Sequence, residues 1–372
     1  MTSGPDRPTR TAAEPRDGGT PPFISVVIPV LNEERHIRDC LASVFAQEYP
    51  TDRFEVIVAD GGSADRTCEI VAEIAAAQPA LRLVDNPARN QAAGLNRAIA
   101  VARGEIIARL DGHAAWRPWH LRRCVELLAE TGADNVGGRM EAVGETAVAE
   151  AVARATSSPL GVGEAHFHYA TRAMDTETVF LGCFRREALD RVGPFNESYP
   201  PHEDYELNHR IRQGGGRIVY SPDIPTTYWA RATWRTLIRQ YFRYGRAKTR
   251  VARHTPGVVR RHHLAPPTLV ASLPLAAVGL AWQRPRRAVV ALAGLYAAAC
   301  LVEGARKSRG AAIGVRLRVP LVFPVLHLSW GAGFWAGLVS PGRSGPVTRA
   351  RQPSQEQVRP VAARGEDRDL LG

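Results

Sequence analysis

Acidic and imidazole side chains follow a short apolar stretch in the middle of the chain. The run Glu105–Leu110 reads as a buried strand, and Asp111, Gly112 and His113 follow it directly. A carboxylate and an imidazole at a strand end can bind a divalent cation and, through it, a phosphate. Imidazole favours Mn²⁺ over Mg²⁺, so the metal stays open between the two. By itself, Asp-Gly is equally typical of a turn with a solvated histidine.

Acidic residues at two further positions could also take part in chemistry. Asp60 ends a second apolar run and is followed by Gly61, which either lets a ligand approach the backbone or simply makes a turn. Glu203 and Asp204 open a polar helix. A carboxylate there can serve as a general base, but the helix dipole favours acids at this position in any helix.

Alternating strands and helices must position these residues. Three helices separate four apolar runs, which predicts a doubly wound, mostly parallel α/β sheet. Ligands bind beyond the carboxyl ends of such strands, so we expect the residues at these ends to converge on one site. They are Asn32 and Glu33, Asp60 with its glycines, Asp85 and Asn86, and Asp111 to His113. Asn32 should cap the first helix, with Glu33 in its first turn. The predicted strands are 23–30, 54–59, 81–84 and 105–110.

The alternation of strands and helices becomes less regular after residue 113. Residues 157–176 are rich in Ser, Gly, His and Tyr and predict a long mobile loop. The other predicted elements are a helix at 119–130, strands at 136–140 and 178–181, and a helix that opens at 202.

Charge is divided unevenly along the chain. The net charge is +11, yet residues 1–230 hold 24 Arg and no Lys against 32 acidic residues, whereas residues 231–340 hold 18 basic residues and one acid, Glu303. The basic part is also the apolar part, which indicates anionic lipid and excludes nucleic acid as a partner. Five scattered cysteines without a CxxC pair argue against a disulfide framework or a zinc site.

The segment after residue 230 predicts attachment to the cell membrane. Residues 231–263 hold ten basic residues and no acid. One helical face carries apolar side chains, which predicts a basic amphipathic helix at the membrane surface; they are Trp234, Leu237, Ile238, Tyr241 and Phe242. A membrane region over 264–340 follows, either multi-pass or anchored as a hairpin, with three apolar runs at 264–283, 288–302 and 319–339.

Both ends of the chain are predicted to be disordered. Residues 1–22 lack the apolar segment of a signal peptide, and residues 341–372 are rich in Pro, Arg and Gly. We therefore expect the globular domain at 23–230 to stay cytoplasmic, and the basic segment 306–318 with it.

Five motifs resemble, in order and spacing, those of the family-2 glycosyltransferases with the GT-A fold. The likeness covers about residues 23–250, and it is greatest to the membrane-bound glycosyltransferases of succinoglycan-type exopolysaccharide synthesis. The motifs are Ile24–Glu34, Asp60–Thr67, Asp111-Gly112-His113, Glu203-Asp204 and Gln240–Tyr244.

The resemblance implies a role for each motif residue. Asp204 matches the base that deprotonates the acceptor hydroxyl in a single inverting displacement. Asp111 and His113 match the metal-binding Asp-x-Asp, with His113 where an Asp is usual. The matches to nucleotide contacts are Pro29, Asn32, Glu33, Asp60, Gly61 and Asp111, with Asp60 at the uracil ring, and those near acceptor and diphosphate are Glu203, Gln240 and Arg243.

The implied function is the metal-dependent transfer of a sugar from a UDP-sugar, with UDP-glucose favoured, to a lipid-linked or membrane-proximal saccharide in polysaccharide biosynthesis. Two alternatives stay open: a polyprenyl-phosphate glycosyltransferase, and a non-catalytic nucleotide-sugar-binding subunit of an export complex. A membrane transport or structural protein is disfavoured, because over half of the chain has the α/β pattern.

Overall fold

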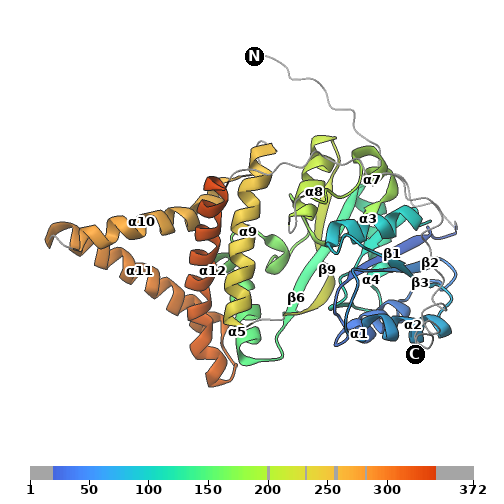
Figure 1. Cartoon of the computed structure of the whole chain (residues 1–372), viewed down its shortest axis with the longest axis horizontal. Coiled ribbons are helices and arrows are strands. Elements are labelled where there is room, and N and C mark those ends of the chain that lie inside the picture. Colours follow the sequence, from blue (N-terminus) through green and yellow to red (C-terminus); the bar gives the residue numbers. More distant parts are fainter. Residues whose placement is uncertain (1–19, 199–201, 231–232, 255–258, 281–282, 341–372) are drawn as a thin grey trace, which may run out of the picture.

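A mixed sheet of nine strands forms the centre of the described chain, and helices extend from one side of it (Figure 1). The computed structural model describes residues 20–198, 202–230, 233–254, 259–280 and 283–340. The predicted disordered tail 341–372, and residues 1–19 of the predicted lead, lie outside this range.

The N-terminal half is a parallel sheet with the strand order β3-β2-β1-β4. Strands β1 and β2 are buried along their whole length between two apolar clusters, which is why they read as unbroken apolar runs. Val30 pairs with Asp60, and Asp60 with Asp85, so three strands end level. The elements are β1 (Ile24–Val30), α1 (Ile37–Phe45), β2 (Phe54–Asp60), α2 (Thr67–Ala77), β3 (Leu81–Asp85), α3 (Gln91–Val101) and β4 (Ile106–Arg109).

The second half continues the sheet with antiparallel and parallel pairs. Strand β8 runs antiparallel to β4, and β6 lies between β8 and β9. The doubly wound prediction is therefore confirmed for the N-terminal half, and the complete sheet is mixed. The elements are β5 (Ala114–Trp116), α4 (His120–Thr131), β6 (Asn135–Val143), α5 (Ala147–Thr156), β7 (Met174–Asp175), β8 (Phe180–Arg185), α7 (Arg186–Val192), α8 (Glu203–Gln213) and β9 (Ile218–Trp229).

The predicted mobile loop at 157–176 is wrong in part, because the segment contains ordered turns. It holds the short helix α6 (Pro159–Val162), the 3-10 turn η1 (His166–His168) and strand β7. The Ser158 hydroxyl accepts from Leu160 N–H at 3.2 Å, and the Tyr169 hydroxyl donates to Gly163 O at 2.7 Å. These local hydrogen bonds fix the chain without a hydrophobic periodicity that the sequence would reveal.

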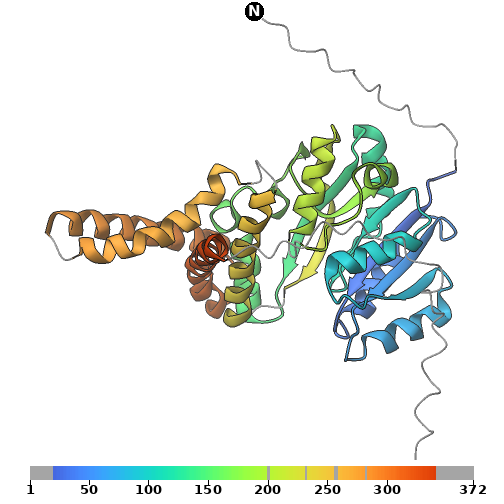
Figure 2. The ribbon, with the colours of Figure 1, turned by 45° about the horizontal axis from the view of Figure 1, so that its top comes forward.

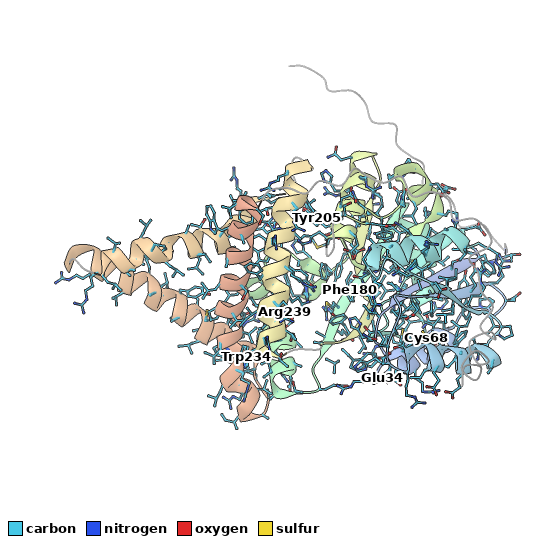
Figure 3. The ribbon with its side chains drawn as sticks, viewed as in Figure 1. Glu34, Cys68, Phe180, Tyr205, Trp234 and Arg239 are labelled. Atoms are coloured by element: carbon cyan, nitrogen blue, oxygen red, sulfur yellow. The ribbon has the colours of Figure 1, made fainter. Side chains whose placement is uncertain are left out.

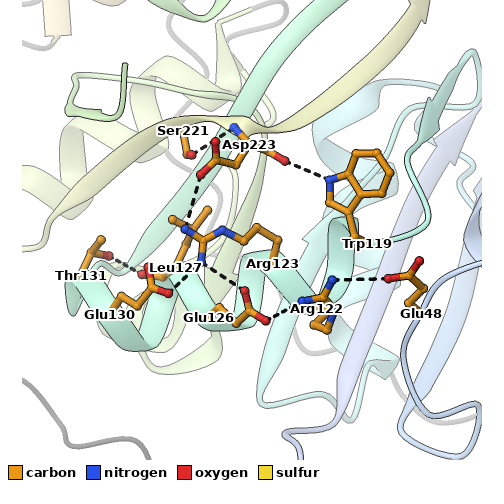
Figure 4. Close-up of polar contacts among 10 residues, drawn as sticks. All are labelled: Glu48, Trp119, Arg122, Arg123, Glu126, Leu127, Glu130, Thr131, Ser221 and Asp223. Atoms are coloured by element: carbon orange, nitrogen blue, oxygen red, sulfur yellow. Dashed lines mark hydrogen bonds and ion pairs between the residues drawn. The ribbon is translucent and has the colours of Figure 1, made fainter. Parts of the chain in front are cut away.

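Helix α4 is tied to the middle of strand β9 (Figure 4). Arg123 pairs with Glu130 at 2.7 Å and reaches Asp223 of β9 at 3.4 Å, while the Trp119 indole donates to Asp223 O at 3.1 Å. Exposed pairs of this kind contribute little energy each. They orient β9, whose far end supplies residues to the site below.

Four helices form the C-terminal region (Figures 1 and 2). Helices α9 and α12 lie side by side, and α10 and α11 form a hairpin that projects away from the sheet in both views. Two of the described helices, α11 and α12, are long and apolar enough to cross a membrane. The helices are α9 (Trp234–His254), α10 (Ala265–Gly279), α11 (Gln283–Lys307) and α12 (Ile313–Val339), with the 3-10 turn η2 (Arg261–Leu264) before α10.

Helix α9 covers part of its predicted apolar face with protein. Leu237 is buried, and it packs with Trp234 and Tyr241 in one cluster with residues of α5 and α12. Ile238 of the same face is 47% exposed. The amphipathic pattern thus serves protein packing in part, and the contact of α9 with the membrane surface stays a prediction.

Glycines allow α9 and α12 to touch backbone to backbone. A Cβ atom at Gly245 would lie 1.9 Å from the carbonyl oxygen of Trp330, and one at Gly333 would lie 2.0 Å from that of Phe242. Real Cβ atoms do not approach so closely, so both positions require glycine. The two helices therefore form one tightly packed layer between the sheet and the projecting hairpin.

Candidate active site

The loops that follow β1 and β2 are joined by hydrogen bonds. The Asn32 N–H donates to the Ser63 hydroxyl at 2.9 Å, and the Asn32 side chain accepts from Ala64 N–H at 2.8 Å. The Glu33 N–H donates to Thr67 Oγ1 at 2.7 Å. These bonds hold the two strand ends as a single platform, which is where a nucleotide is expected.

The structure corrects the predicted start of the first helix. Helix α1 begins at Ile37 with His36 at its N-cap, so Asn32 does not cap it and Glu33 is not in its first turn. Asn32 instead has a φ of 57°, the left-handed conformation that asparagine tolerates better than most residues. This geometry turns its side chain toward the second loop.

Asp60 and Gly61 lie at the buried end of β2. The Asp60 carboxylate accepts hydrogen bonds from Gly62 N–H at 3.0 Å and from both the N–H and the hydroxyl of Ser63. The carboxylate is thus held by donors from its own loop, which fixes its position at the end of β2. Gly61 donates its N–H to Val30 O at 2.8 Å. Pro29 is buried in β1 and lies behind this surface.

Arg109 connects the end of β4 to helix α8. Its side chain is 4% exposed and donates to Asp111 Oδ1 from two nitrogens at 3.2 Å. It also bonds to the Asp204 carboxylate and lies 3.9 Å from Glu203 Oε1. Gln91, at the start of α3, adds a hydrogen bond to Asp111 Oδ1 at 3.1 Å. One guanidinium thus gathers three acids that the sequence places in two distant segments.

The two acids of helix α8 have different surroundings. Glu203 is 2% exposed, and burial together with the charge of Asp204 raises its pKa to about 7, although Arg109 opposes the shift. Its Oε2 has no hydrogen-bond partner among the residues described. The Asp204 side chain is 32% exposed. Burial also raises the pKa of Asp204, and Arg109 again opposes the shift. Asp204 is therefore the acid of the pair that an incoming molecule can reach.

His113 lies against Glu33 and Tyr228. Its Nδ1 is 3.0 Å from Glu33 Oε1, and its ring packs edge-on against Tyr228 of β9 at a centroid distance of 4.9 Å. Because a carboxylate only accepts, Nδ1 carries the proton and Nε2 is left as the basic nitrogen. Within the described ranges, no three His, Cys, Asp or Glu side chains converge as a complete metal site.

Helix α9 places part of the last motif near these acids. Gln240 donates to the Tyr244 hydroxyl at 2.7 Å, and Tyr244 O lies 3.0 Å from Nε2 of His202, the residue before α8. Burial raises the pKa of Tyr244, with smaller contributions from the charges of Glu203 and Asp111. Arg243 is exposed, and no described contact joins it to the acids.

Arg109 is the residue that the sequence reasoning missed. It stands inside the buried run 105–110, and a buried arginine requires acidic partners. That signal was present in the sequence, but it does not say which acids are the partners. Of the predicted residues, Asp111, Glu203 and Asp204 meet directly at Arg109. Asn32 and Asp60 share the adjoining platform through Ser63.

Comparison with known proteins gives consistent results. A sequence model described as glycosyl transferase family 2 matches residues 25–193. The succinoglycan biosynthesis protein ExoA of Rhizobium meliloti is 33% identical over 84% of this chain and 94% of that protein. The dolichyl N-acetyl-alpha-D-glucosaminyl phosphate 3-beta-D-2,3-diacetamido-2,3-dideoxy-beta-D-glucuronosyltransferase of Methanococcus voltae is 28% identical over 61% of this chain and 73% of its own length.

A solved structure shares the architecture. The mannosyltransferase PcManGT from Pyrobaculum calidifontis, determined with GDP-Man and Mn²⁺, superposes with a TM-score of 0.59 at 24% identity, covering 86% of this chain and 88% of that one. The sheet order, the strand-end platform and the acids around Arg109 define a glycosyltransferase of the GT-A fold. The chain belongs to glycosyltransferase family 2.

Proposed function

We propose that this protein transfers a sugar from a UDP-sugar, with UDP-glucose as the favoured donor, to a lipid-linked saccharide in polysaccharide or glycolipid biosynthesis. The observation that carries the proposal is the bridge made by Arg109. It holds Asp111, beside the nucleotide platform, next to Asp204, which opens toward solvent on the other side. Donor and acceptor chemistry therefore have adjacent sites.

Asp204 is the proposed general base. The acceptor hydroxyl attacks the anomeric carbon, its proton passes to the Asp204 carboxylate, and the bond to the nucleoside diphosphate breaks, which inverts the anomeric centre. Partial exposure of Asp204 supports this role, because the acceptor must reach the base. Glu203, buried behind it with a pKa of about 7, shapes the charge around Arg109.

The donor set at Asp111 and His113 fits a divalent cation, Mg²⁺ or Mn²⁺. His113 directs Nδ1 to the Glu33 carboxylate, which is the usual outer-shell arrangement of a metal-binding imidazole. Two protein ligands suffice when substrate phosphates complete the coordination. The cation would neutralise charge on the departing diphosphate. Asn32, Glu33, Asp60 and Gly61 are the proposed contacts of the nucleotide, and Gln240 and Arg243 lie on the helix expected near the diphosphate and acceptor.

Relatives and the C-terminal helices support a membrane acceptor. The name of the Methanococcus voltae relative describes a dolichyl-phosphate-linked sugar as its substrate. In this chain, α11 and α12 are long enough to cross a bilayer, and α11 is scarcely covered by protein. We therefore place the protein at the cell membrane with its catalytic domain on the cytoplasmic side.

The deciding experiment is a donor screen with the purified full-length protein. UDP- and GDP-sugars are compared for release of nucleoside diphosphate, with Mg²⁺ and with Mn²⁺, in the presence of lipid-linked saccharides or of bare polyprenyl phosphate. Release from a UDP-sugar that requires a lipid-linked saccharide is the expected result. Efficient transfer to bare polyprenyl phosphate would reject the acceptor, and the absence of release with every donor would favour a non-catalytic binding subunit.

A further inference from the structure

A cavity of about 620 Å³ lies between the sheet and the end of helix α11, away from the acids around Arg109. Strand β6, helix α5 and the segment around η1 form its walls. Lys307, the last residue of α11, closes it. Because α11 is one of the two helices apolar enough to enter a bilayer, this cavity opens where protein and membrane would meet.

The charges that line the cavity do not balance. Glu150 pairs with Arg154 at 2.9 Å, and Glu141 pairs with Arg117 at 3.0 Å, so both acids are neutralised. Lys307 and the remaining arginine, Arg139, make no ion pair among the residues described; Glu303 acts on Lys307 through its charge and is itself paired with Arg306 at 2.5 Å.

Both of these cations bind neutral groups, and Arg139 also bonds to the Tyr220 side chain. The Arg139 guanidinium donates to Ala170 O at 2.9 Å, and the Lys307 ammonium donates to Ser157 O. Arg139 Nε is buried and has no acceptor within the described part of the chain. Both cations are held by neutral groups, and Arg139 has an unused N–H donor. Such a pair of cations can bind a phosphate group.

A second hollow of about 430 Å³ lies against α11, and its lining includes Glu303 and Arg306 near the end of that helix. It begins at Ser158, next to Ser157 of the cavity, and passes over Leu160, Ala299 and Val302. Its lining is mostly apolar, and Val302 is 69% exposed. The cavity supplies the basic residues Arg139 and Lys307, and the second hollow supplies an apolar surface along α11. Together they have the properties of a binding site for a phosphorylated lipid.

A row of aromatic rings joins the cavity to His113. Tyr228, which touches His113, meets Phe180 at 5.6 Å, and Phe180 meets Phe167 at 6.0 Å. Phe167 packs on His168, which lines the cavity, at 4.5 Å. Figure 3 labels Phe180 on the side of the sheet that faces α9. Aromatic faces of this kind offer an apolar surface for the C–H face of a sugar ring.

We propose that this cavity binds the acceptor's lipid carrier: Arg139 and Lys307 hold its phosphate, the groove along α11 holds its chain, and the aromatic row guides the attached saccharide toward Asp204. The proposal rests on the function proposed above and adds the residues that recognise the acceptor. None of these residues belongs to the nucleotide platform.

The test measures binding of farnesyl diphosphate to the full-length protein in detergent, with saturating UDP to block the donor site. Farnesol and inorganic pyrophosphate are the comparison probes. Arg139→Met and Lys307→Met should each weaken farnesyl diphosphate binding at least tenfold. Val302→Asn should weaken farnesyl diphosphate but not pyrophosphate. Arg122→Met, on α4 and paired with Glu126 at 2.9 Å, is the matched control and should bind like the wild type.

Two outcomes overturn the proposal. Unchanged affinity in both cation variants removes the phosphate site, and pyrophosphate binding as tight as that of farnesyl diphosphate identifies a site for free phosphate only. Release of UDP from the donor in the presence of lipid-linked saccharides is measured in parallel, with thermal unfolding as the folding check. UDP release that needs a lipid-linked saccharide, without farnesyl diphosphate binding, rejects this inference alone, whereas the absence of release with every donor and acceptor rejects the proposed function.

Discussion

The guanidinium of Arg109 donates a hydrogen bond to the carboxylate of Asp204, across a separation of 95 residues. The same guanidinium contacts Asp111, two residues along the chain. An ion pair therefore joins strand β4 to helix α8 at Asp204, the proposed base. Because Arg109 belongs to β4 and bonds to Asp204, the position of Asp204 depends on this strand.

Replacing Asp204 by Asn should remove turnover and leave donor binding intact. Asparagine can still accept a hydrogen bond from Arg109, but it cannot take a proton, and general-base catalysis typically contributes about 10²–10⁴-fold. Transfer rates and UDP affinity measured on the same preparation test this. Asp223→Asn, at an exposed carboxylate on β9, is the control, and an unchanged rate in Asp204→Asn would reject the base assignment.

Replacing Arg109 by Met should destabilise the fold by about 3–5 kcal/mol, because it leaves buried carboxylates without their cation. Arg109 lowers the pKa values of Glu203 and Asp204, so its loss raises both in the folded state. The folded state then binds more protons than the unfolded state, so the variant loses stability as pH rises. Thermal unfolding of both proteins at pH 5 and pH 8 should show the larger deficit at pH 8. A deficit independent of pH would contradict the charge argument.

Glu203 should impose a pH dependence of its own on the wild type. Its folded pKa of about 7 lies above its usual value, so protons favour the folded state and stability falls as pH rises between about 4.5 and 7. Glu203→Gln removes this titration and should be more stable than the wild type at pH 8, with the difference shrinking toward pH 5. Equal unfolding temperatures at pH 8 would count against the raised pKa.

Changing His113 to Asp should shift metal preference from Mn²⁺ toward Mg²⁺, because an oxygen ligand replaces a nitrogen. Binding of each ion in the presence of UDP, measured by calorimetry, gives a readout separate from turnover. Activity with the two ions supplies the second readout. If neither preference moves, Asp111 is the cation's ligand without help from His113.

The glycine contact between α9 and α12 should not tolerate a methyl group. Gly245→Ala drives a Cβ against the backbone of Trp330, and the helices must separate, with a cost of about 1–3 kcal/mol or more. Gly294→Ala on α11, where a Cβ meets nothing within 4 Å, is the matched control and should be neutral or slightly stabilising. Unfolding in the same detergent compares the two, and equal losses would contradict the close contact.

Sequence patterns predicted the N-terminal half of the sheet well, because apolar strands and the polar residues after them are local features. The contacts of Asn32 were not predictable in the same way, since its partner Ala64 lies in another loop. The partners of Arg109 likewise come from distant segments, and burial alone implies only that acids are needed. For Leu237, the helical pattern identifies an apolar side but does not say whether lipid or α12 covers it.

The packing of α9 against α12 also limits where the chain can be truncated. Leu237 and the alanines of α5 are buried partly by Val319 and Phe323 of α12. A chain cut after residue 263 would expose this cluster to water while keeping every motif residue of the active site. Such a fragment would aggregate or bind detergent, so a soluble catalytic domain cannot be obtained by removing the C-terminal helices alone.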